Sequence, residues 1–566
     1  DNDAADGGEA HISRVCRMSP IVVLVLLLHA TSASALTAGL PRQAQSRPLL
    51  GFRPAAAVLS RPARSRNRPE MFLPATLALR GGLAARTPDQ LFNVLFFGLS
   101  SVCSIVVALS SARDIGASRS SDAAKPSKAA RSLQLRFLLV FWLYKMADWL
   151  QGPYFYEVYA SKVINGAAMT TSSVAKFFLT GFSSTALFGA VVGGMVDSLG
   201  RKRGSLAFAL LYALSALSTR AETLPLLYAG RVAGGLGTSL LFSAPEAWLV
   251  SEHQAGAFGQ AFLSQTFTLA YFGDSLVAIA AGQLAGAAAG LRGPTAPFEL
   301  SIGFLALGAA IAAVTWRENK GGAAEGSGAA EESGAADAPR PSGSIVGDAA
   351  RSHCSGRGCS RLVPPSSPRA GAHAQVRAVA SDRRVALVGA VQALFEGAMY
   401  VFVLQWPPAL KAALGPNVPF GKVFSCFMVC CMIGSSLFGA AIKRVAPEDI
   451  MAVLLACATA AMGAATFATG GALAPIVGAF FAFEACVGCY FPLIGTLRSK
   501  YLPDAYRGVI MNLFGIPLNL IVVAVFLSIG KLGLAGAFAC SFSALATALV
   551  AQLLLRHTVR HDKAAA

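Results

Sequence analysis

The feature that most constrains this chain is a succession of apolar stretches, each about twenty residues long. Stretches of this length cross the hydrocarbon core of a bilayer as helices, because every backbone polar group must be satisfied internally there. Of the 566 residues, 54% are hydrophobic and 13% are charged, and that charged share is about half of the usual share in soluble proteins. The sequence therefore predicts an all-α polytopic membrane protein. Its helices are expected at 91–111, 133–156, 174–195, 205–218, 224–250, 258–289, 298–316, 385–406, 423–442, 450–469, 474–497, 508–529 and 532–555.

A short basic loop separates two of these stretches and reads GGMVDSLGRKR, from Gly193 to Arg203. Gly200 can adopt the left-handed conformation that ends a helix, and the three cations after it hold the loop on the cytoplasmic side. Asp197 can face a helix N-terminus and the neighbouring guanidinium groups. The spacing resembles the signature loop between the second and third helices of major facilitator superfamily transporters, although Ser198 stands where that family usually has a cation. The signature residues are Gly193, Asp197, Gly200, Arg201 and Lys202.

The chain also repeats part of itself. LFGA occurs at 187–190 and again at 437–440, and a basic loop follows both copies. Both copies lie in the second helix of a group of six. Two homologous six-helix halves joined by a cytoplasmic linker are the plan of facilitator transporters. We therefore expect a major facilitator fold with one extra N-terminal transmembrane helix.

The segments outside the helices divide the chain further. Residues 1–35 are interpreted as a misannotated start followed by a signal peptide, because a short apolar run that ends in small residues begins at Met18. Residues 36–87 are rich in Arg, Ala, Ser and Pro, which is typical of a plastid transit peptide or a disordered leader. The remaining expected units are an extra transmembrane helix and basic cytoplasmic loop (88–130), a first half (131–316), a disordered cytoplasmic linker (317–384) and a second half with a basic tail (385–566).

The net charge of +18 is explained by the membrane topology, which sets where the cations lie. Lys and Arg concentrate in the leader and in alternate loops, which the positive-inside rule places on the cytoplasmic side. This distribution predicts a lipid bilayer, and no nucleic acid, as the partner of the basic surface. The cysteines lie mostly inside apolar helices, where they behave as small hydrophobes. Cys354 and Cys359, near His353, could be metal ligands, but they lie in a low-complexity linker without a second ligand pair at zinc spacing. The soluble segments contain no nucleophile or nucleotide-binding motif, so we expect no metal, no cofactor and no enzyme activity.

Longer strings give a narrower resemblance. They are DWLQGPY (148–154), GRVAGGLGTSLLFSAPEAWLVSEH (230–253), QALFEGAMYVFVLQWPPAL (392–410), MIGSSLFG (432–439) and LRSKYLPDAYRGVIMNLFGIPLNLIVV (497–523). These strings resemble the molybdate-anion transporters of algae and animals, a branch of the same superfamily, over about 131–555 apart from the linker. The resemblance implies molybdate as substrate, alternating access as mechanism and the plasma membrane as location. The transit-like leader favours a plastid envelope instead, and we expect a monomer.

Ionisable side chains are unfavourable inside a bilayer, so each one at membrane depth is a candidate site residue. A tetrahedral dianion needs several converging donors, and cations and neutral amides can supply them. Carboxylates at the same depth can carry protons. The predicted substrate-binding residues are Lys145, Arg231, Gln151, Asn512 and Asn519. The predicted proton-coupling residues are Asp148, Glu396, Glu484 and Asp274.

Each assignment has a structural alternative. Lys145 lies three residues before Asp148 on one helix face, and the two could form an ion pair that only stabilises the bundle. Arg231 could pair with a carboxylate of the first half, and the carboxylates as a group could be permanently paired with the two cations. The two asparagines could join helices through hydrogen bonds. Asp274 could be an unpaired carboxylate that faces a water-filled vestibule.

The charge of molybdate, a dianion at neutral pH, sets a condition on its import. Moving one charge against 100 mV requires about 2.3 kcal/mol, so concentrative entry into a negative interior needs a driving ion. We therefore expect proton coupling. The functional alternatives are a facilitator transporter for another solute, such as a sugar or sulfate, and a non-transporting nutrient sensor.

Overall fold

The computed structural model describes residues 87–118, 127–320, 382–469, 471–502 and 507–565. The expected signal peptide, the leader and most of the expected linker lie outside these residues. The described chain is helical apart from connecting turns and one short antiparallel hairpin, formed by β1 (Val163–Ile164) and β2 (Ala167–Ala168). By length and composition, the described helices include eight spans that are able to cross a membrane. The all-α fold that the sequence predicts is confirmed.

The first half begins with α5 (Lys128–Gln151), which continues through the 3-10 turn η1 (Gly152–Tyr154) into α6 (Phe155–Ala160). Pro153 has no N–H to donate, which explains the interruption of the regular helix at this point. A second interruption divides the fourth spanning segment into α9 (Leu224–Leu241) and α10 (Ala244–Ala255). The other helices of this half are α7 (Thr171–Leu199), α8 (Arg201–Ser218), α11 (Gln260–Arg292) and α12 (Ala296–Thr315).

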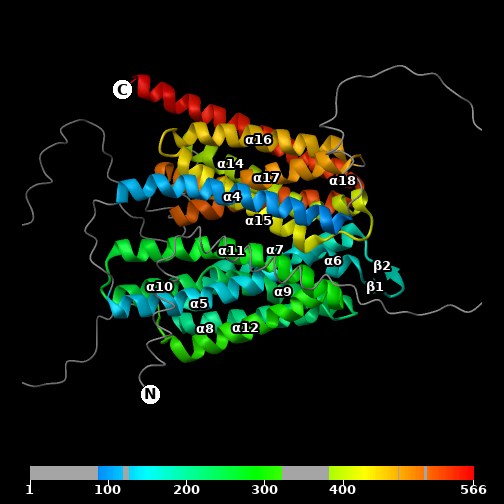
Figure 1. Cartoon of the computed structure of the whole chain (residues 1–566), viewed down its shortest axis with the longest axis horizontal. Helices are drawn as coiled ribbons and strands as arrows, with labels where there is room; N and C mark the ends of the chain where they lie inside the picture. The colour runs from blue at the N-terminus through cyan, green and yellow to red at the C-terminus, as the bar shows by residue number, and fades with distance from the viewer. Residues whose placement is uncertain (1–86, 119–126, 321–381, 470, 503–506, 566) are drawn as a thin grey trace, which may run out of the picture.

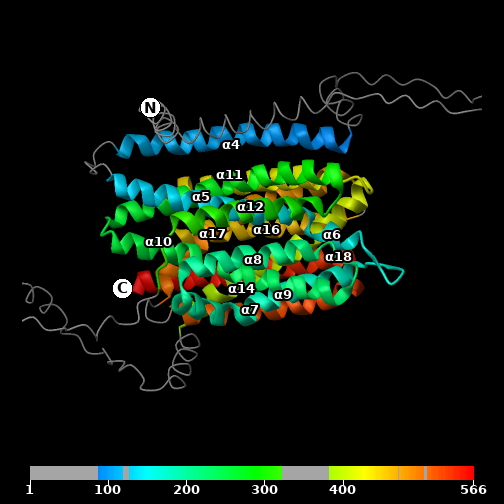
Figure 2. The same ribbon diagram turned by 90° about the horizontal axis from the view of Figure 1, so that it is seen from below.

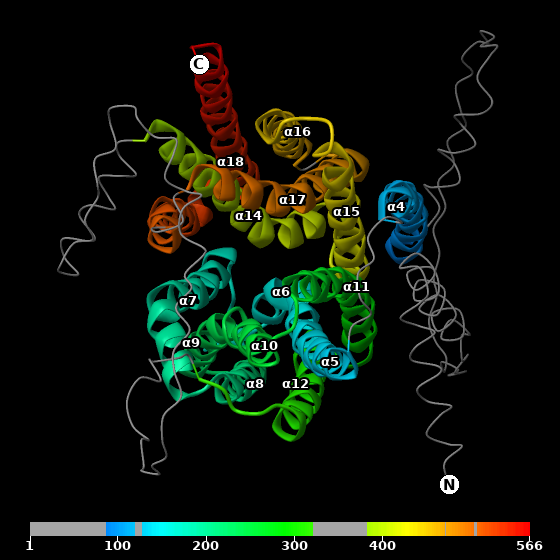
Figure 3. The same ribbon diagram turned by 90° about the vertical axis from the view of Figure 1, so that its left-hand side faces the viewer.

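The second half repeats the arrangement of the first. Its last element, α18 (Arg507–Ala565), contains two helices, because Gly533 has a φ of 63° and breaks the helical geometry between them. Figure 3 looks along the helices and shows the second half, coloured yellow to red, beside the first half, coloured cyan to green. Six-helix halves are thus present in the described part of the chain, as predicted. The remaining helices of the second half are α14 (Arg383–Leu414), α15 (Phe420–Ala441), α16 (Pro447–Ala468) and α17 (Leu473–Tyr501).

One further helix, α4 (Pro88–Ser118), lies outside both halves and beside α15 (Figures 1 and 3). Its first turn is fixed by an ion pair of 2.7 Å between Asp89 Oδ2 and Lys422 Nζ. Phe92 and Phe96 are buried against the bundle, whereas Ile105 is exposed on the opposite side, where acyl chains would cover it. This helix is the extra N-terminal span that the sequence predicts.

The two ends of the bundle differ in charge. One end, called here the basic end, carries the loop cations Arg201, Lys202, Arg203, Lys443, Arg444, Arg498 and Lys500. The opposite end, called the hairpin end, carries β1 and β2, which project from the bundle in Figure 2. At the hairpin end, Arg220 pairs with Glu299 at 2.7 Å. By the positive-inside rule, we expect the basic end to be the cytoplasmic one.

The halves contact each other at the hairpin end and near the middle of the bundle. At the hairpin end, Lys411 Nζ on α14 lies 2.9 Å from Glu157 Oε2 on α6. Deeper in the bundle, the rings of Phe182 on α7 and Tyr400 on α14 lie 4.7 Å apart between centroids. These contacts hold the hairpin ends of the two halves together.

Candidate functional site

Lys145 lies in the last third of α5, and only 6% of its surface is exposed. Its ammonium nitrogen lies 3.4 Å from Asp274 Oδ2 on α11. It also lies 5.4 Å from the ring centroid of Trp149 and 5.2 Å from that of Phe242. Both kinds of contact stabilise a desolvated ammonium group, and the carboxylate supplies the counter-charge without which a buried cation is strongly destabilising. The site therefore contains a cation at membrane depth beside two aromatic rings.

Asp274 is not the unpaired carboxylate that the sequence left as one alternative. Besides its ion pair with Lys145, it accepts a hydrogen bond of 2.7 Å from Trp149 Nε1. The other alternative, an ion pair between Lys145 and Asp148, is also wrong. The physical reason is that α11 packs against α5 and brings its own carboxylate to the ammonium group, which the spacing within α5 cannot reveal.

Asp148 and Gln151 have partners on other helices of the first half. The hydroxyl of Tyr212 on α8 donates a hydrogen bond to Asp148 Oδ1. Gln151 is buried, and its Nε2 donates to Ser301 Oγ on α12 at 3.1 Å. Both residues thus connect α5 to neighbouring helices, and their roles toward a substrate or a proton stay predictions.

Arg231 lies in the hairpin-end half of α9, and its guanidinium carbon is 4.3 Å from the ring centroid of Phe155. Its Nε is buried and has no hydrogen-bond partner. Within the described ranges no carboxylate forms an ion pair with it. The alternative in which Arg231 pairs with a carboxylate of the first half is therefore wrong for the part of the chain that the structure describes. Among the described residues, the face of Phe155 contacts its guanidinium group.

The space for this guanidinium group comes from Gly181 on α7. A Cβ at position 181 would lie 2.4 Å from Arg231 Nη2 and 3.1 Å from Cζ. Real Cβ atoms do not come as close as the first of these distances, so any side chain at Gly181 would displace the guanidinium group. The position of Arg231 thus depends on a glycine of the neighbouring helix.

The second half contributes two of the predicted carboxylates. Glu396 on α14 accepts a hydrogen bond of 3.0 Å from the hydroxyl of Tyr490 on α17. Glu484 on α17 is 7% exposed, and its Oε2 lies 3.0 Å from the thiol sulfur of Cys431 on α15. Neither carboxylate has a cation partner among the residues that the structure describes. The alternative of permanent pairing with Lys145 or Arg231 is therefore wrong for both.

The two asparagines predicted at the site lie on the first helix of α18. Asn519 is half-buried, and its side chain makes no hydrogen bond to another described residue. The side chain of Asn512 lies outside the described part of the structure. Their roles as substrate ligands stay predictions.

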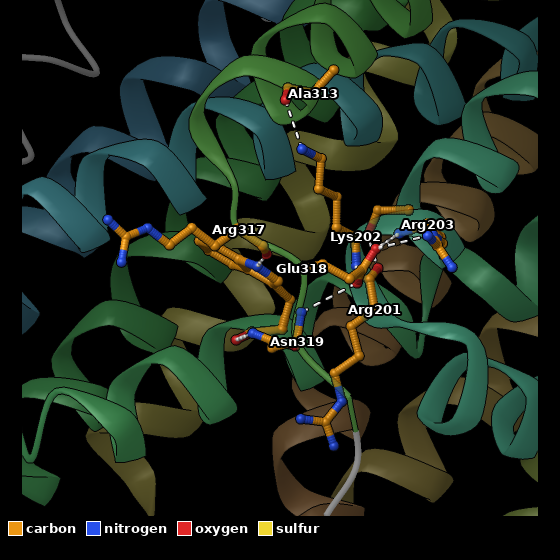
Figure 4. A network of polar contacts seen from close by, with 9 residues as sticks. Arg201, Lys202, Arg203, Ala313, Arg317, Glu318 and Asn319 are labelled. Carbon is orange, nitrogen blue, oxygen red and sulfur yellow. Dashed lines mark hydrogen bonds and ion pairs between the residues drawn. The ribbon is translucent and has the colours of Figure 1, made fainter.

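The signature loop binds the segment that follows α12, as Figure 4 shows. Glu318 accepts hydrogen bonds from the backbone N–H groups of Lys202 (3.0 Å) and Arg203 (3.1 Å). Gly200 has a φ of 122°, and a Cβ there would lie 2.4 Å from the carboxyl carbon of Glu318. The carboxylate thus caps the N-terminus of α8, where the first N–H groups have no helical partner. Only a residue without a side chain fits between them.

The same segment is held by neighbouring groups. The backbone N–H of Arg201 donates to Asn319 O at 2.9 Å (Figure 4). The rings of Trp248 on α10 and Trp316 stack at 3.9 Å and 6°. The signature loop, α10 and the start of the linker therefore form one unit at the basic end. Of the predicted signature residues, Gly193 and Asp197 lie on α7. The side chain of Asp197 lies outside the part of the chain that the structure describes.

The residues that contact the predicted site residues were not predicted from the sequence. Trp149 lies inside the string DWLQGPY, which marks a resemblance but not a role. Tyr212 and Phe155 carry no charge and lie in apolar runs, where hydropathy gives no sign of a polar contact. Gly181 is one of many glycines, and nothing in the sequence distinguishes it from the others. Glu318 lies at the start of the expected linker, where no contact with the helices was expected.

The comparisons with known proteins agree on the fold and the family. A family model named MFS_5, described as sugar transporters with 12 transmembrane helices, matches residues 91–341 and 369–490. A protein of Takifugu rubripes named molybdate-anion transporter is 32% identical over 76% of this chain and 86% of its own length. A Danio rerio protein of the same name is 32% identical over 75% of this chain and 85% of its own length. These relatives confirm the prediction of a transporter and not an enzyme.

Solved structures support the major facilitator fold alone. The crystal structure of the POT family transporter PepTSo has a TM-score of 0.56 at 10% identity, and the match covers 77% of this chain and 99% of that one. A nucleoside transporter has a TM-score of 0.55 at 9% identity, with coverage of 76% and 99%. At such identities the likeness extends to the helix arrangement and not to the residues of a site.

Proposed function

Because the chain belongs to the MFS_5 family of twelve-helix transporters within the major facilitator superfamily, we propose that it imports molybdate across its membrane by alternating access. It is a secondary transporter with several spans in the membrane. The name of the curated relatives supports molybdate as the substrate, and the electrostatics of the first half supports an anion.

One observation carries the proposal for an anion: Arg231 is a cation at membrane depth for which the described residues supply no carboxylate. A guanidinium group at this depth is unfavourable without a counter-charge. A tetrahedral dianion would supply that charge, with Arg231 and Lys145 as its charged donors. Gln151, Asn512 and Asn519 would add neutral hydrogen bonds.

The alternative functions differ in which charged groups of the site they would leave without a partner or a role. A sugar, which the description of the family model names, is neutral and would leave Arg231 without a counter-charge. Sulfate shares the shape and the charge of molybdate, so the name of the relatives is what favours molybdate over it. A non-transporting sensor would have no use for Glu396 and Glu484, which are carboxylates at membrane depth without an ion-pair partner among the described residues.

Alternating access is supported by where the halves meet. Lys411 and Glu157 join the halves at the hairpin end, and Phe182 and Tyr400 meet near the middle. We interpret this arrangement as the state that is closed at the hairpin end, which faces away from the cytoplasm. Import then requires the Lys411–Glu157 pair to separate, because the substrate enters from that end.

Proton coupling would make concentrative import possible. A dianion that enters against 100 mV meets about 4.6 kcal/mol, which opposes accumulation by more than about a thousandfold. Two protons carried with each molybdate would make entry electroneutral. We propose Asp148, Asp274, Glu396 and Glu484 as the carriers. The plasma membrane is the proposed location, with a plastid envelope as the alternative, and a monomer is the proposed state.

Uptake of isotope-labelled molybdate into cells that lack their own molybdate permease tests the proposed function. We expect uptake with the wild-type chain and loss of uptake with Lys145→Ala and with Arg231→Ala at equal surface level. Lys162→Ala, which changes a cation in the hairpin-end loop, is the matched control and should keep uptake. Unchanged uptake in either site variant removes that residue from the site.

A further inference from the structure

We propose that Asp274 is a resident counter-ion that occupies Lys145 between transport cycles and that the transported oxyanion must displace. The inference rests on the proposed function and deepens it, because it assigns one carboxylate as the competitor of the substrate. It also explains how an anion site and a proton site can be the same place.

The geometry points to competition because a carboxylate oxygen and an oxyanion oxygen are the same kind of acceptor. Asp274 Oδ2 lies 3.4 Å from the ammonium nitrogen of Lys145, and the rings of Trp149 and Phe242 flank the ammonium group. With 8% of the Lys145 side chain exposed, little room is left for a second anion beside Asp274. A substrate oxygen therefore reaches Lys145 most directly by taking the place of Asp274 Oδ2.

Asp148 differs from Asp274 although both lie near Lys145. Asp148 accepts its hydrogen bond from Tyr212, and no cation lies within ion-pair distance of it among the described residues. Displacing Asp148 would therefore free no donor for the substrate. Asp274 instead has a second hydrogen bond from Trp149 Nε1, which can hold the carboxyl group in place after Lys145 has left it.

The charged groups around Asp274 come from few elements. Helix α5 supplies Lys145 and Asp148, and α12 and α15, which also pack against α11, supply no charged partner to Asp274 within the described residues. On α11 itself, Tyr271 lies near the level of Asp274 and donates to Glu246 of α10 at 2.6 Å. Lys145 is thus the cation whose availability depends on the charge of Asp274.

Competition of this kind couples a proton to the anion without direct contact between them. A proton that binds Asp274 Oδ2 from the hairpin-end solvent cancels the carboxylate charge and releases Lys145 to the oxyanion. After the halves rearrange, the anion leaves toward the basic end. The proton then leaves Asp274 to the same side, and the carboxylate pairs with Lys145 again.

The test is equilibrium binding of molybdate and, separately, of sulfate to the purified full-length protein in lipid nanodiscs. Asp274→Asn keeps the shape and the hydrogen bond from Trp149 but removes the competing charge. We expect it to bind the oxyanion about tenfold more tightly than the wild type at neutral pH, within the usual range of coupling between two sites. We also expect wild-type affinity to rise as pH falls, and Asp274→Asn affinity to depend on pH less steeply than wild-type affinity does.

Two further variants decide the assignment. Glu246→Gln keeps the hydrogen bond from Tyr271 and should bind like the wild type at every pH. Asp148→Asn leaves the Lys145–Asp274 pair intact and should not tighten binding. Equal or weaker binding by folded Asp274→Asn, or equal tightening by Asp148→Asn, overturns the inference. If Asp274→Asn does not fold, a wild-type affinity that is independent of pH overturns it.

The two anions separate failure of this inference from failure of the proposed function. A protein that binds sulfate and not molybdate overturns the proposed substrate, and the comparison of variants is then made with sulfate. Absence of binding of either anion to every folded variant contradicts both proposals.

Discussion

The guanidinium group of Arg231 occupies the space that the missing side chain of Gly181 leaves, since a Cβ on Gly181 would come within 2.4 Å of Nη2. Gly181 lies on α7 and Arg231 on α9, so the contact between these two helices fixes where the cation points. The proposed anion site is therefore set by a residue that carries no functional group.

Gly181→Ala should weaken molybdate binding and uptake without removing the protein from the membrane. The added methyl group must displace the guanidinium group, and losing a hydrogen bond to a charged group costs about 1.5–3 kcal/mol, or roughly tenfold to a hundredfold in affinity. Uptake kinetics at matched surface level measure this effect as an increased KM. Gly189→Ala, on the same helix with its nearest contact at 3.5 Å, is the control and should keep the wild-type KM. A wild-type KM for Gly181→Ala would separate Gly181 from the site.

Gly200→Ala should slow transport and leave substrate binding nearly unchanged. The new methyl group would meet the Glu318 carboxylate that caps α8, and loss of such a cap costs about 1 kcal/mol. Glu318→Ala removes the same cap from the other side and should have the same effect. Turnover and equilibrium binding are measured for both variants. Weakened binding with normal turnover would contradict a conformational role for the loop.

Glu157→Gln should shift the carrier toward the state that is open at the hairpin end. The ion pair with Lys411 joins the halves there, and a partly exposed pair is worth up to about 1 kcal/mol, or about a fivefold change in the ratio of the two states. Spin labels placed on the two halves at the hairpin end would report the change in the distance between the halves. The charge exchange Glu157→Lys with Lys411→Glu should restore the wild-type ratio, and its failure to do so would assign the effect to something other than the pair.

Glu396→Gln and Glu484→Gln should uncouple transport from protons and preserve molybdate binding. Glutamine can still accept the hydrogen bond from Tyr490 at position 396, so the change removes the titrating group and keeps the geometry. Counterflow of molybdate without a proton gradient should continue, whereas uptake driven by the gradient should stop. Normal gradient-driven uptake in both variants would leave these carboxylates with a structural role.

The sequence was sufficient for the fold because hydropathy and helix length decide it. Apolar stretches of fixed length must become helices in a bilayer, and a repeated LFGA string marked the two halves. Interruptions within the spanning segments and short elements between them were harder to predict. The interruption of α9 before Pro245 and the hairpin at 163–168 did not follow from hydropathy, because they depend on turn geometry and on contacts between neighbouring helices.

For the site, the charged residues were predictable and their partners were not. Lys145, Asp148 and Asp274 are conspicuous in apolar runs, but which carboxylate meets the ammonium group depends on how α11 is rotated against α5. The neutral partners Trp149 and Tyr212 give no signal in hydropathy or charge. Contacts between helices that are distant in sequence require the three-dimensional packing.

Flux of isotope-labelled molybdate into proteoliposomes, with an imposed inward proton gradient at clamped membrane potential, isolates molybdate transport by this chain from every other cellular permease. We expect accumulation of molybdate above its equilibrium level, inhibition by excess unlabelled molybdate, no inhibition by a neutral sugar, and loss of accumulation when the gradient is removed. Flux no faster than in protein-free liposomes would contradict molybdate transport by this chain. Molybdate flux that ignores the pH gradient would contradict proton coupling.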